Sequence, residues 1–201
     1  MPHTPPPAPD PRPSWSGWIV GFAAAAWLAG VAAGFAAWDA YDATPDPQAA
    51  AGPGEPSVAP WTLTLYAHPH CPCMRAGLAE LAELTRALPA GVAVHVAFVR
   101  PAGAQPGWER TAGWDAAAAI PGVTVRCDAG GEDAARVGVT ASGCAVLADA
   151  TGRVAFRGGL TRGRGRAGES AARRTILGIV AGELMDGEAP VFGCPLANDP
   201  R

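Results

Sequence analysis

The change of pattern across residues 61–88 constrains the fold of this chain more than any other feature. The apolar run Trp61–Ala67 has the length of a strand. After it, apolar residues recur at helical spacing, at Met74, Leu78, Leu81, Leu84 and Leu88. The segment between them, His68–Met74, carries two thiols, two imidazoles and a thioether. We therefore expect a strand that leads directly into a helix, with Cys71 and Cys73 at the junction.

The junction favours reactive thiols. Pro72 suits the first helical position, because its missing N–H would have no partner there, so Cys71 is the expected N-cap. The unpaired N–H groups and the dipole of a helix N-terminus favour the thiolate, which is both a nucleophile and a metal ligand. His68 and His70 would add positive charge when protonated. Burial as two small residues is the structural alternative.

The cysteine count and the net charge limit the remaining possibilities. Five cysteines cannot all pair within one chain, so at least one thiol is free, metal-bound or paired between molecules. They are Cys71, Cys73, Cys127, Cys144 and Cys194. A net charge of −3 gives no broad basic surface, and we expect no nucleic-acid partner.

The segment 17–38 has the composition of a membrane-spanning helix. It contains no charged residue and is long enough to cross a hydrocarbon core of roughly 30 Å. Arg12 is the only fixed positive charge before it, and acidic residues follow it, so the positive-inside rule predicts a cytoplasmic N-terminus. A cleaved signal peptide is the alternative, because small residues such as Ala36 and Ala37 lie near a possible cleavage site. Both interpretations place the rest of the chain on the periplasmic side.

This pattern divides the chain into four parts. We expect a disordered cytoplasmic N-terminus at 1–16, a transmembrane helix at 17–38, a flexible linker at 39–59 and a folded domain at 60–201 with a cysteine-containing tail. Two G-x-x-x-G spacings within 17–38 would let two such helices approach closely, which predicts a homodimer through this segment.

The folded part reads as a small α/β domain. Further strands are expected at 92–98, 123–126, 145–148 and 154–156, the last two as a hairpin. Helices are expected at 108–120, 132–137 and 170–185. The tail from Ala189 to Leu196 closes the chain and carries Cys194.

The order of these elements resembles the thioredoxin fold, a central mixed sheet flanked by helices. More narrowly, the chain resembles the RedB-type membrane-anchored thioredoxin-like proteins. The matching segments are His68–Cys73, Ile120–Val123, Thr140–Gly143, Gly158–Gly163 and Pro190–Cys194. The Cys-Pro-Cys and the terminal Val-Phe-Gly-Cys are the specific parts of this likeness. The resemblance implies the architecture and the positions of the site more than a reaction.

The chain departs from ordinary thioredoxins at two points. Only Pro72 separates the two thiols, where the usual motif has two residues, and closing a disulfide across one residue strains its geometry and makes it easier to reduce. Gly143 stands where thioredoxins place a cis-proline opposite the active site. That substitution predicts that Cys144 lies beside Cys71.

Thiol–disulfide exchange on the thiols or disulfides of exported proteins is the leading functional hypothesis. Cys71 attacks as the thiolate and Cys73 resolves the mixed disulfide, with Cys144 or Cys194 as a second resolving thiol. An alternative for Cys194 is a structural disulfide in an oxidising compartment. No cofactor is expected under this hypothesis.

Two other functions stay open. A copper-binding or metallochaperone module would use Cys71 and Cys73 with His68 or His70, because thiolate and imidazole ligands suit copper. A tethered binding module without catalysis is the third interpretation, and it predicts no phenotype for Cys71→Ser.

Overall fold

A computed structural model describes residues 15–196 of the chain. It divides into two compact units, one ending at Tyr41 and one beginning at Asp42. The disorder expected for residues 1–16 lies outside the described residues, except that Trp15 and Ser16 belong to the first helix.

The described part of the first unit, up to Tyr41, belongs to one long helix. Helix α1 covers Trp15–Ala43 and so extends five residues past the expected end at Trp38. Its apolar side chains, including Trp18 and Phe22, are exposed. By length and composition, Gly17–Ala43 could cross a membrane, and the same properties fit a signal sequence or an anchor.

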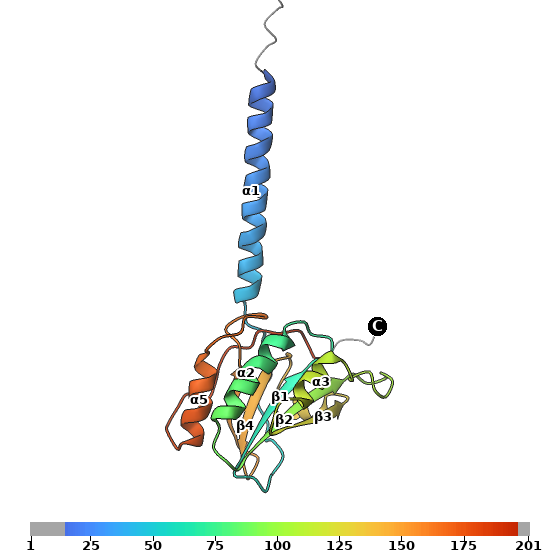
Figure 1. The fold of residues 1–201 in the computed structure, drawn as a ribbon, viewed down its shortest axis with the longest axis vertical. Helices are drawn as coiled ribbons and strands as arrows, with labels where there is room; N and C mark the ends of the chain where they lie inside the picture. The colour runs from blue at the N-terminus through green and yellow to red at the C-terminus, as the bar shows by residue number, and fades with distance from the viewer. Residues whose placement is uncertain (1–14, 197–201) are drawn as a thin grey trace, which may run out of the picture. The chain divides into compact units, whose positions relative to one another are not determined.

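The second unit is built on a five-stranded mixed sheet with the order β3-β2-β1-β4-β5 (Figure 1). The strands are β1 Trp61–Ala67, β2 Val92–Arg100, β3 Val123–Ala129, β4 Cys144–Asp149 and β5 Val154–Gly159. Strands β1, β2 and β3 pair in parallel, whereas β4 pairs antiparallel with β1 and β5 antiparallel with β4. All five predicted strands are therefore present.

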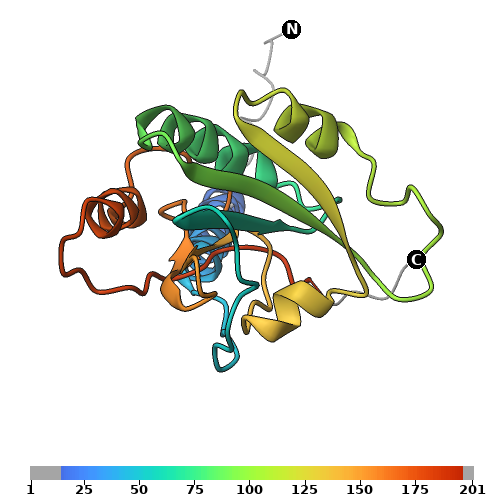
Figure 2. The same ribbon diagram turned by 90° about the horizontal axis from the view of Figure 1, so that it is seen from below.

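Four helices flank this sheet, as expected for the α/β class. They are α2 Met74–Ala87, α3 Ala112–Ala118, α4 Glu132–Arg136 and α5 Ala171–Val180. Figure 2 shows α2 and α3 on one side of the sheet and α4 on the other. Helix α3 begins four residues after the expected start at Trp108, and α5 ends five residues before Met185.

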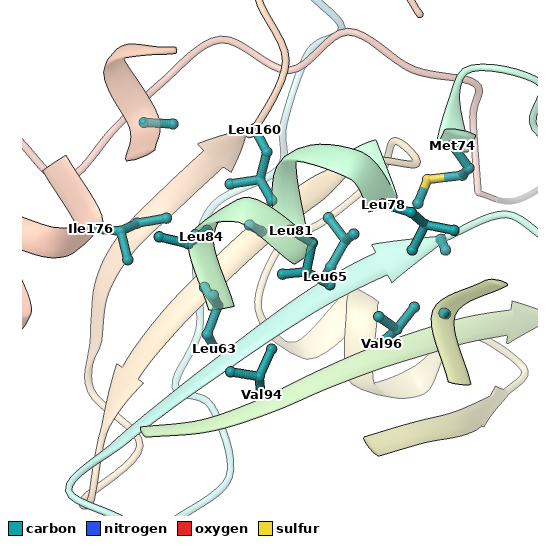
Figure 3. Close-up of a cluster of buried hydrophobic side chains, with 14 of the residues drawn as sticks. Leu63, Leu65, Met74, Leu78, Leu81, Leu84, Val94, Val96, Leu160 and Ile176 are labelled. Carbon is teal, nitrogen blue, oxygen red and sulfur yellow. The ribbon is translucent and has the colours of Figure 1, made fainter. Parts of the chain in front are cut away.

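The main core lies between the sheet and α2. Alternation along β1 sends Leu63 and Leu65 toward the helix, and both are fully buried. The leucines of α2 pack against them from above, with Leu81 completely buried (Figure 3). The helical spacing that predicted α2 therefore exists because one face of the helix covers the parallel part of the sheet.

Residues 44–59, which we call the strap, differ from the flexible linker expected at 39–59. The strap lies against the folded unit through backbone hydrogen bonds along its length. Their N···O distances are 2.7 Å from Asp46 to Val191, 3.1 Å from Ala49 to Gly138, 2.7 Å from Gly54 to Gly152 and 3.1 Å from Ser57 to Ala150. A segment poor in apolar residues is held here by hydrogen bonds to loops, which composition does not reveal.

The C-terminal tail crosses the sheet edge where two glycines leave room. Arg157 N donates to Gly187 O at 2.8 Å, and Gly159 N donates to Pro190 O at 3.2 Å. A Cβ atom on Gly159 would lie 2.7 Å from Pro190 O, closer than side chains tolerate. The paired glycines of β5 are thus required by the close approach of the tail.

Candidate functional site

Three of the five thiols meet at the end of β1 that faces α2. The Sγ atoms of Cys71, Cys73 and Cys194 all lie within 4.8 Å of one another. Cys71 is buried and the other two are half-buried. Cys71 Sγ lies 3.1 Å from Cys194 Sγ, although the two residues are 123 positions apart. We call these residues the three-thiol cluster.

The Cys-Pro-Cys segment forms a tight turn ahead of the helix. Cys71 N donates to His68 O at 3.0 Å, and Met74 N donates to Cys71 O at 3.2 Å. The helix therefore begins at Met74, and Cys73 occupies the N-cap position. The expectation that Cys71 is the N-cap was wrong, because the bond spanning three residues makes residues 71–73 a turn of their own.

The tail brings Cys194 to this turn. Ser142 N donates to Cys194 O at 2.8 Å, and His68 N donates to the Ser142 hydroxyl at 2.9 Å, so one serine joins both segments. Gly193 approaches the Ser142 carbonyl so closely that any Cβ atom there would clash. The glycine in Val-Phe-Gly-Cys is therefore needed to place the following thiol.

An ion pair that is largely shielded from water holds the tail from its other side. Asp46 of the strap accepts from Gly193 N at 2.7 Å and pairs with Arg164 at 3.0 Å. The Arg164 guanidinium also donates to Gly193 O. The side chains of Arg164 and Asp46 are only 10% and 17% exposed, so the pair is shielded from water. We call Asp46, Arg164 and Gly193 the clamp.

The surroundings favour the protonated form of Cys73 and Cys194. Burial raises the pKa of Cys73, and the neighbouring Cys71 thiol raises it further, against a lowering by Arg164. Burial, together with the hydrogen bond and the charge of Cys71, raises the pKa of Cys194 to about 12. Charge on one sulfur therefore opposes charge on the next.

His68 and His70 lie beside Trp108 and not in the cluster. The His68 and His70 ring centres are 5.5 Å and 4.6 Å from that of Trp108. His68 Nδ1 accepts from His70 N at 3.2 Å, which puts the proton of the neutral ring on Nε2. Burial, followed by the charge of His70, lowers the pKa of His68. Among the described residues the metal-ligand group contains three thiols and neither histidine, so the expected histidine ligands are not brought to the thiols.

Cys144 is on the opposite face of the sheet, which corrects the prediction that it lies beside Cys71. It is fully buried and packs with Tyr66, its register partner on β1. Gly143 has φ +89° and donates to Tyr66 O at 2.8 Å, so β4 starts with Cys144 directed away from α2. Burial raises the pKa of Cys144 to about 12. Cys127, on the edge strand β3, is also outside the cluster.

Two residues of the site have no signal in the sequence. Trp108 precedes α3 in a loop, and Asp46 lies in the strap, each far from the cysteines along the chain. Only the folded arrangement shows that Trp108 borders the histidines and that Asp46 fixes the tail.

The cluster fits a soft metal ion as well as a disulfide. With metal–sulfur distances of about 2.3 Å, a planar three-sulfur site needs sulfurs about 4 Å apart. The upper limit of 4.8 Å for the sulfur separations and the Cys71–Cys194 separation of 3.1 Å lie on either side of that value. Thiolates of this kind select Cu(I).

Comparisons with known proteins bear on the fold. No protein-family model matches the chain, and no curated protein matches it. A hypothetical protein from Sinorhizobium meliloti is 17% identical, with 77% of this chain and 96% of that chain covered and a TM-score of 0.57. An uncharacterized conserved protein from Geobacillus kaustophilus is 20% identical, with 80% and 93% covered and a TM-score of 0.57.

A secreted disulfide oxidoreductase from Mycobacterium tuberculosis, homologous to DsbE of Escherichia coli, is 20% identical over 61% of this chain and 81% of that chain, with a TM-score of 0.41. Likeness at such identities concerns the fold alone, and it rests on the two structures with a TM-score of 0.57. The fold is the thioredoxin fold, as its strand order, its parallel β1–β2 pair and its antiparallel β4 and β5 indicate. This chain is a protein of the thioredoxin-like fold, with an apolar helix at its N-terminus.

Proposed function

We propose that this protein is a thiol–disulfide oxidoreductase whose working pair is Cys71 and Cys194. The observation that carries the proposal is their Sγ separation of 3.1 Å. A disulfide has an S–S length of about 2.05 Å, so the two sulfurs need to move by only about 1 Å to bond. Cys71 and Cys73, by contrast, are separated by a single proline, which opposes the disulfide geometry.

The exchange proceeds in two balanced steps. The Cys71 thiolate attacks one sulfur of a substrate disulfide, which forms a mixed disulfide and releases one substrate thiolate. Cys194 gives its proton to the released substrate thiolate, and its sulfur then attacks Cys71 Sγ, so that a Cys71–Cys194 disulfide forms and the second substrate sulfur leaves as a thiolate that takes up a proton from the solvent. The substrate gains the two electrons that the cysteine pair loses, and the reverse sequence oxidises a substrate dithiol. Cys73, within 4.8 Å of both sulfurs, can capture a mixed disulfide that Cys194 does not resolve.

The location we propose is the periplasmic side, with α1 as an uncleaved anchor and exported protein thiols or disulfides as substrates. The support is the apolar length of Gly17–Ala43 and the single positive charge that precedes it. The resemblance to RedB-type proteins supports the same role, because the cluster joins its two specific motifs, Cys-Pro-Cys and Val-Phe-Gly-Cys. Protease digestion of intact spheroplasts should remove the folded unit if it lies on the periplasmic side. Mass spectrometry of the protein in the membrane fraction should give the mass of the full chain if α1 is an anchor, and a smaller mass if α1 is a cleaved signal.

The test of the exchange reaction uses the full chain in phospholipid nanodiscs. Mild oxidation followed by peptide mass mapping should give a Cys71–Cys194 disulfide. Cys71→Ser should abolish reduction of a fluorescent disulfide peptide, and Cys194→Ser should leave the mixed disulfide with that peptide in place for longer. Cys127→Ser is the matched control, since Cys127 lies outside the cluster. Full activity in Cys71→Ser would show that Cys71 is not the attacking thiol, and no activity in the wild type would leave a binding module without catalysis.

Binding of Cu(I) is a second candidate, supported by the three-sulfur geometry. This function predicts about one copper per chain in the reduced protein, lost in Cys71→Ser, Cys73→Ser and Cys194→Ser alike. His70→Ala should retain the metal, because His70 is not in the cluster. Copper bound equally by the three serine variants would rule out this site.

A further inference from the structure

The two outer strands of the sheet differ, because one is covered and the other is open. The outer strands are β5 and β3, and Figure 1 shows β3 next to β2. The tail covers β5, since Arg157 N donates to Gly187 O at 2.8 Å and Ala189 N donates to Arg157 O at 3.2 Å. Among residues 15–196, neither a strand nor an isolated bridge pairs with the outer side of β3. This edge of the sheet can therefore accept another strand.

Alternation along β3 decides which of its backbone groups are open. Gly130 N donates to Arg100 O at 2.8 Å, so the even-numbered residues of the strand direct their N–H and C=O groups toward β2. The groups of Val125, Cys127 and Ala129 then point away from the sheet. Within the described part of the chain, no backbone bond joins them to another segment. The open edge is thus a row of donors and acceptors with the spacing of a strand.

Strand β3 lacks the features by which natural sheets block the addition of a strand. Val123–Ala129 contains no proline, glycine or lysine, and it pairs with β2 without a bulge. Its two charged side chains are held by the folded unit. Arg126 pairs with Asp133, and Asp128 accepts from the N–H groups of Asp133 and Ala134 at 3.1 Å and 3.0 Å. Nothing in the strand itself therefore opposes pairing along this edge.

The strand is complementary to itself in one antiparallel register. In a two-fold pair of β3 strands, outward-facing residues lie opposite one another. With Cys127 on the axis, Arg126 lies opposite Asp128 of the second copy, twice by symmetry, and opposite charges across strands are favourable. A pair centred on Arg126 would place two arginines opposite each other. A pair centred on Val125 would place Arg126 opposite Thr124. Charge therefore selects the register centred on Cys127.

We propose that this edge is the interface of a homodimer, in which β3 pairs antiparallel with β3 of a second copy and Cys127 lies opposite Cys127 of that copy. The pairing joins two five-stranded sheets into one continuous sheet. Cα atoms of such a hydrogen-bonded pair are about 5.5 Å apart, within the range that two linked thiols span. This interface differs from the dimer expected through the segment 17–38, and it does not depend on the exchange reaction.

The first test measures the mass of the full chain in a zwitterionic detergent by light scattering over a dilution series. We expect a dimer that dissociates on dilution. Val125→Pro removes an N–H that faces away from β2, so the monomer keeps its ladder and the dimer loses two hydrogen bonds. Its dimer Kd should rise at least about tenfold. Val125→Thr is the matched control, because threonine keeps the N–H and the branched Cβ, and it should dimerise as the wild type does.

The second test measures the register by crosslinking. A bis-methanethiosulfonate with a two-carbon spacer is added at pH 8.5, because burial raises the pKa of the Cys127 thiol. Peptide mass mapping should find Cys127 linked to Cys127 of the second copy, and Cys127→Ser should remove this dimer. Thr124→Cys, made in the Cys127→Ser chain, is the control. Thr124 is exposed on the same strand, yet in this register the two copies of residue 124 lie roughly 20 Å apart.

Three results would each overturn the proposal. They are a full chain that stays monomeric at the highest concentration used, a dimer of Val125→Pro as tight as that of Val125→Thr, and crosslinking of Thr124→Cys as efficient as that of Cys127. A dimer that persists in Val125→Pro would point to α1 as the interface. The yield of the Cys71–Cys194 disulfide in Val125→Pro should equal that of the wild type, so failure of the dimer and failure of the exchange reaction are distinguishable.

Discussion

The pKa of Cys144 and the pKa of Cys194 are both raised to about 12, but the surroundings of the two thiols differ. Cys144, the first residue of β4, is completely buried, and only desolvation raises its pKa. Cys194 is half-buried, and the neighbouring Cys71 adds to the effect of burial. The raised pKa of Cys144 affects the stability of the fold, whereas the raised pKa of Cys194 affects thiol–disulfide exchange.

The buried thiol of Cys144 predicts a loss of stability at high pH. Its pKa lies above the value of 9.0 for an exposed thiol, so between about pH 9 and 12 the native state holds more protons than the unfolded state. The free energy of unfolding then falls as pH rises, by at most about 1.4 kcal/mol per pH unit from this thiol. Urea unfolding of reduced wild type and Cys144→Ala, measured from pH 8 to about 11, should show a flatter dependence in the variant. Parallel curves would contradict the assignment.

Substitution of Gly193 should displace Cys194 from Cys71 while the protein still folds. Gly193→Ala puts a Cβ atom against the Ser142 carbonyl, so the tail must shift and carry Cys194 away from Cys71. We expect a loss of about 1–3 kcal/mol in the free energy of unfolding and a large drop in the yield of the Cys71–Cys194 crosslink. Mass mapping after mild oxidation measures the second effect. Gly77→Ala in α2 is the control, since its Cβ would make only ordinary contacts, at 3.6 Å from Met74; its crosslink yield should stay at the wild-type level.

At the scale of elements, the tail and the strap act together. Neither contains a helix or a long strand, yet each hydrogen-bonds to the other through Asp46 and to the loops around the site. The turn between β1 and α2 supplies Cys71, and these two irregular segments supply and fix its partner. The element that carries Cys194 is therefore held by polar contacts, not by the apolar core alone.

The clamp predicts that Asp46 matters for the distant thiols. Asp46→Ala leaves the Arg164 guanidinium without this carboxylate in a largely buried place, and it removes the acceptor for Gly193 N. Loss of one member of a buried pair costs about 3–5 kcal/mol, and the partial exposure here lowers that expectation to about 2–3 kcal/mol. Alkylation of Cys194 should also become faster. Glu169→Ala, which breaks an exposed ion pair with Arg174, should change stability by less than about 1 kcal/mol. Equal effects of the two variants would show that the clamp does not hold the tail.

At the scale of the whole molecule, the boundary between the two units falls before the strap. The sequence suggested a folded domain from residue 60, with a free linker ahead of it. The structure makes Asp42 the first residue of the second unit, and Asp42 pairs with Arg166 at 3.3 Å within that unit. The folded unit thus includes its own N-terminal strap.

This boundary can be tested by truncation. A chain that begins at Asp42 should fold and form the Cys71–Cys194 disulfide as the full chain does. A chain that begins at Pro60 lacks the strap, so it should melt at a clearly lower temperature and expose Cys194 to alkylation. Circular dichroism melting and alkylation rates compare the two. Identical behaviour of both truncations would restore the idea of a free linker.

Local sequence patterns predicted much of this protein because they report on its core. The helix after Cys-Pro-Cys follows from periodicity, since burial on one face imposes a repeat of 3.6 residues. The strands follow from short apolar runs, and the long apolar helix follows from its length without charged residues. The likeness to thioredoxins followed from the order of those elements. That Cys71 and Cys73 belong to one site followed from their position at the strand-to-helix junction.

The choice of partners for Cys71 was decided by the tertiary structure alone. Cys194, His70 and Cys144 were all candidates in the sequence, and contact between segments far apart along the chain brought in the first and left out the others. The alternation of side chains along β4 directs Cys144 to the far face of the sheet, and the clamp places Cys194 against the turn. Local residue types and spacings determine elements, whereas hydrogen bonds of the tail and the strap, which have no period, determine which side chains meet.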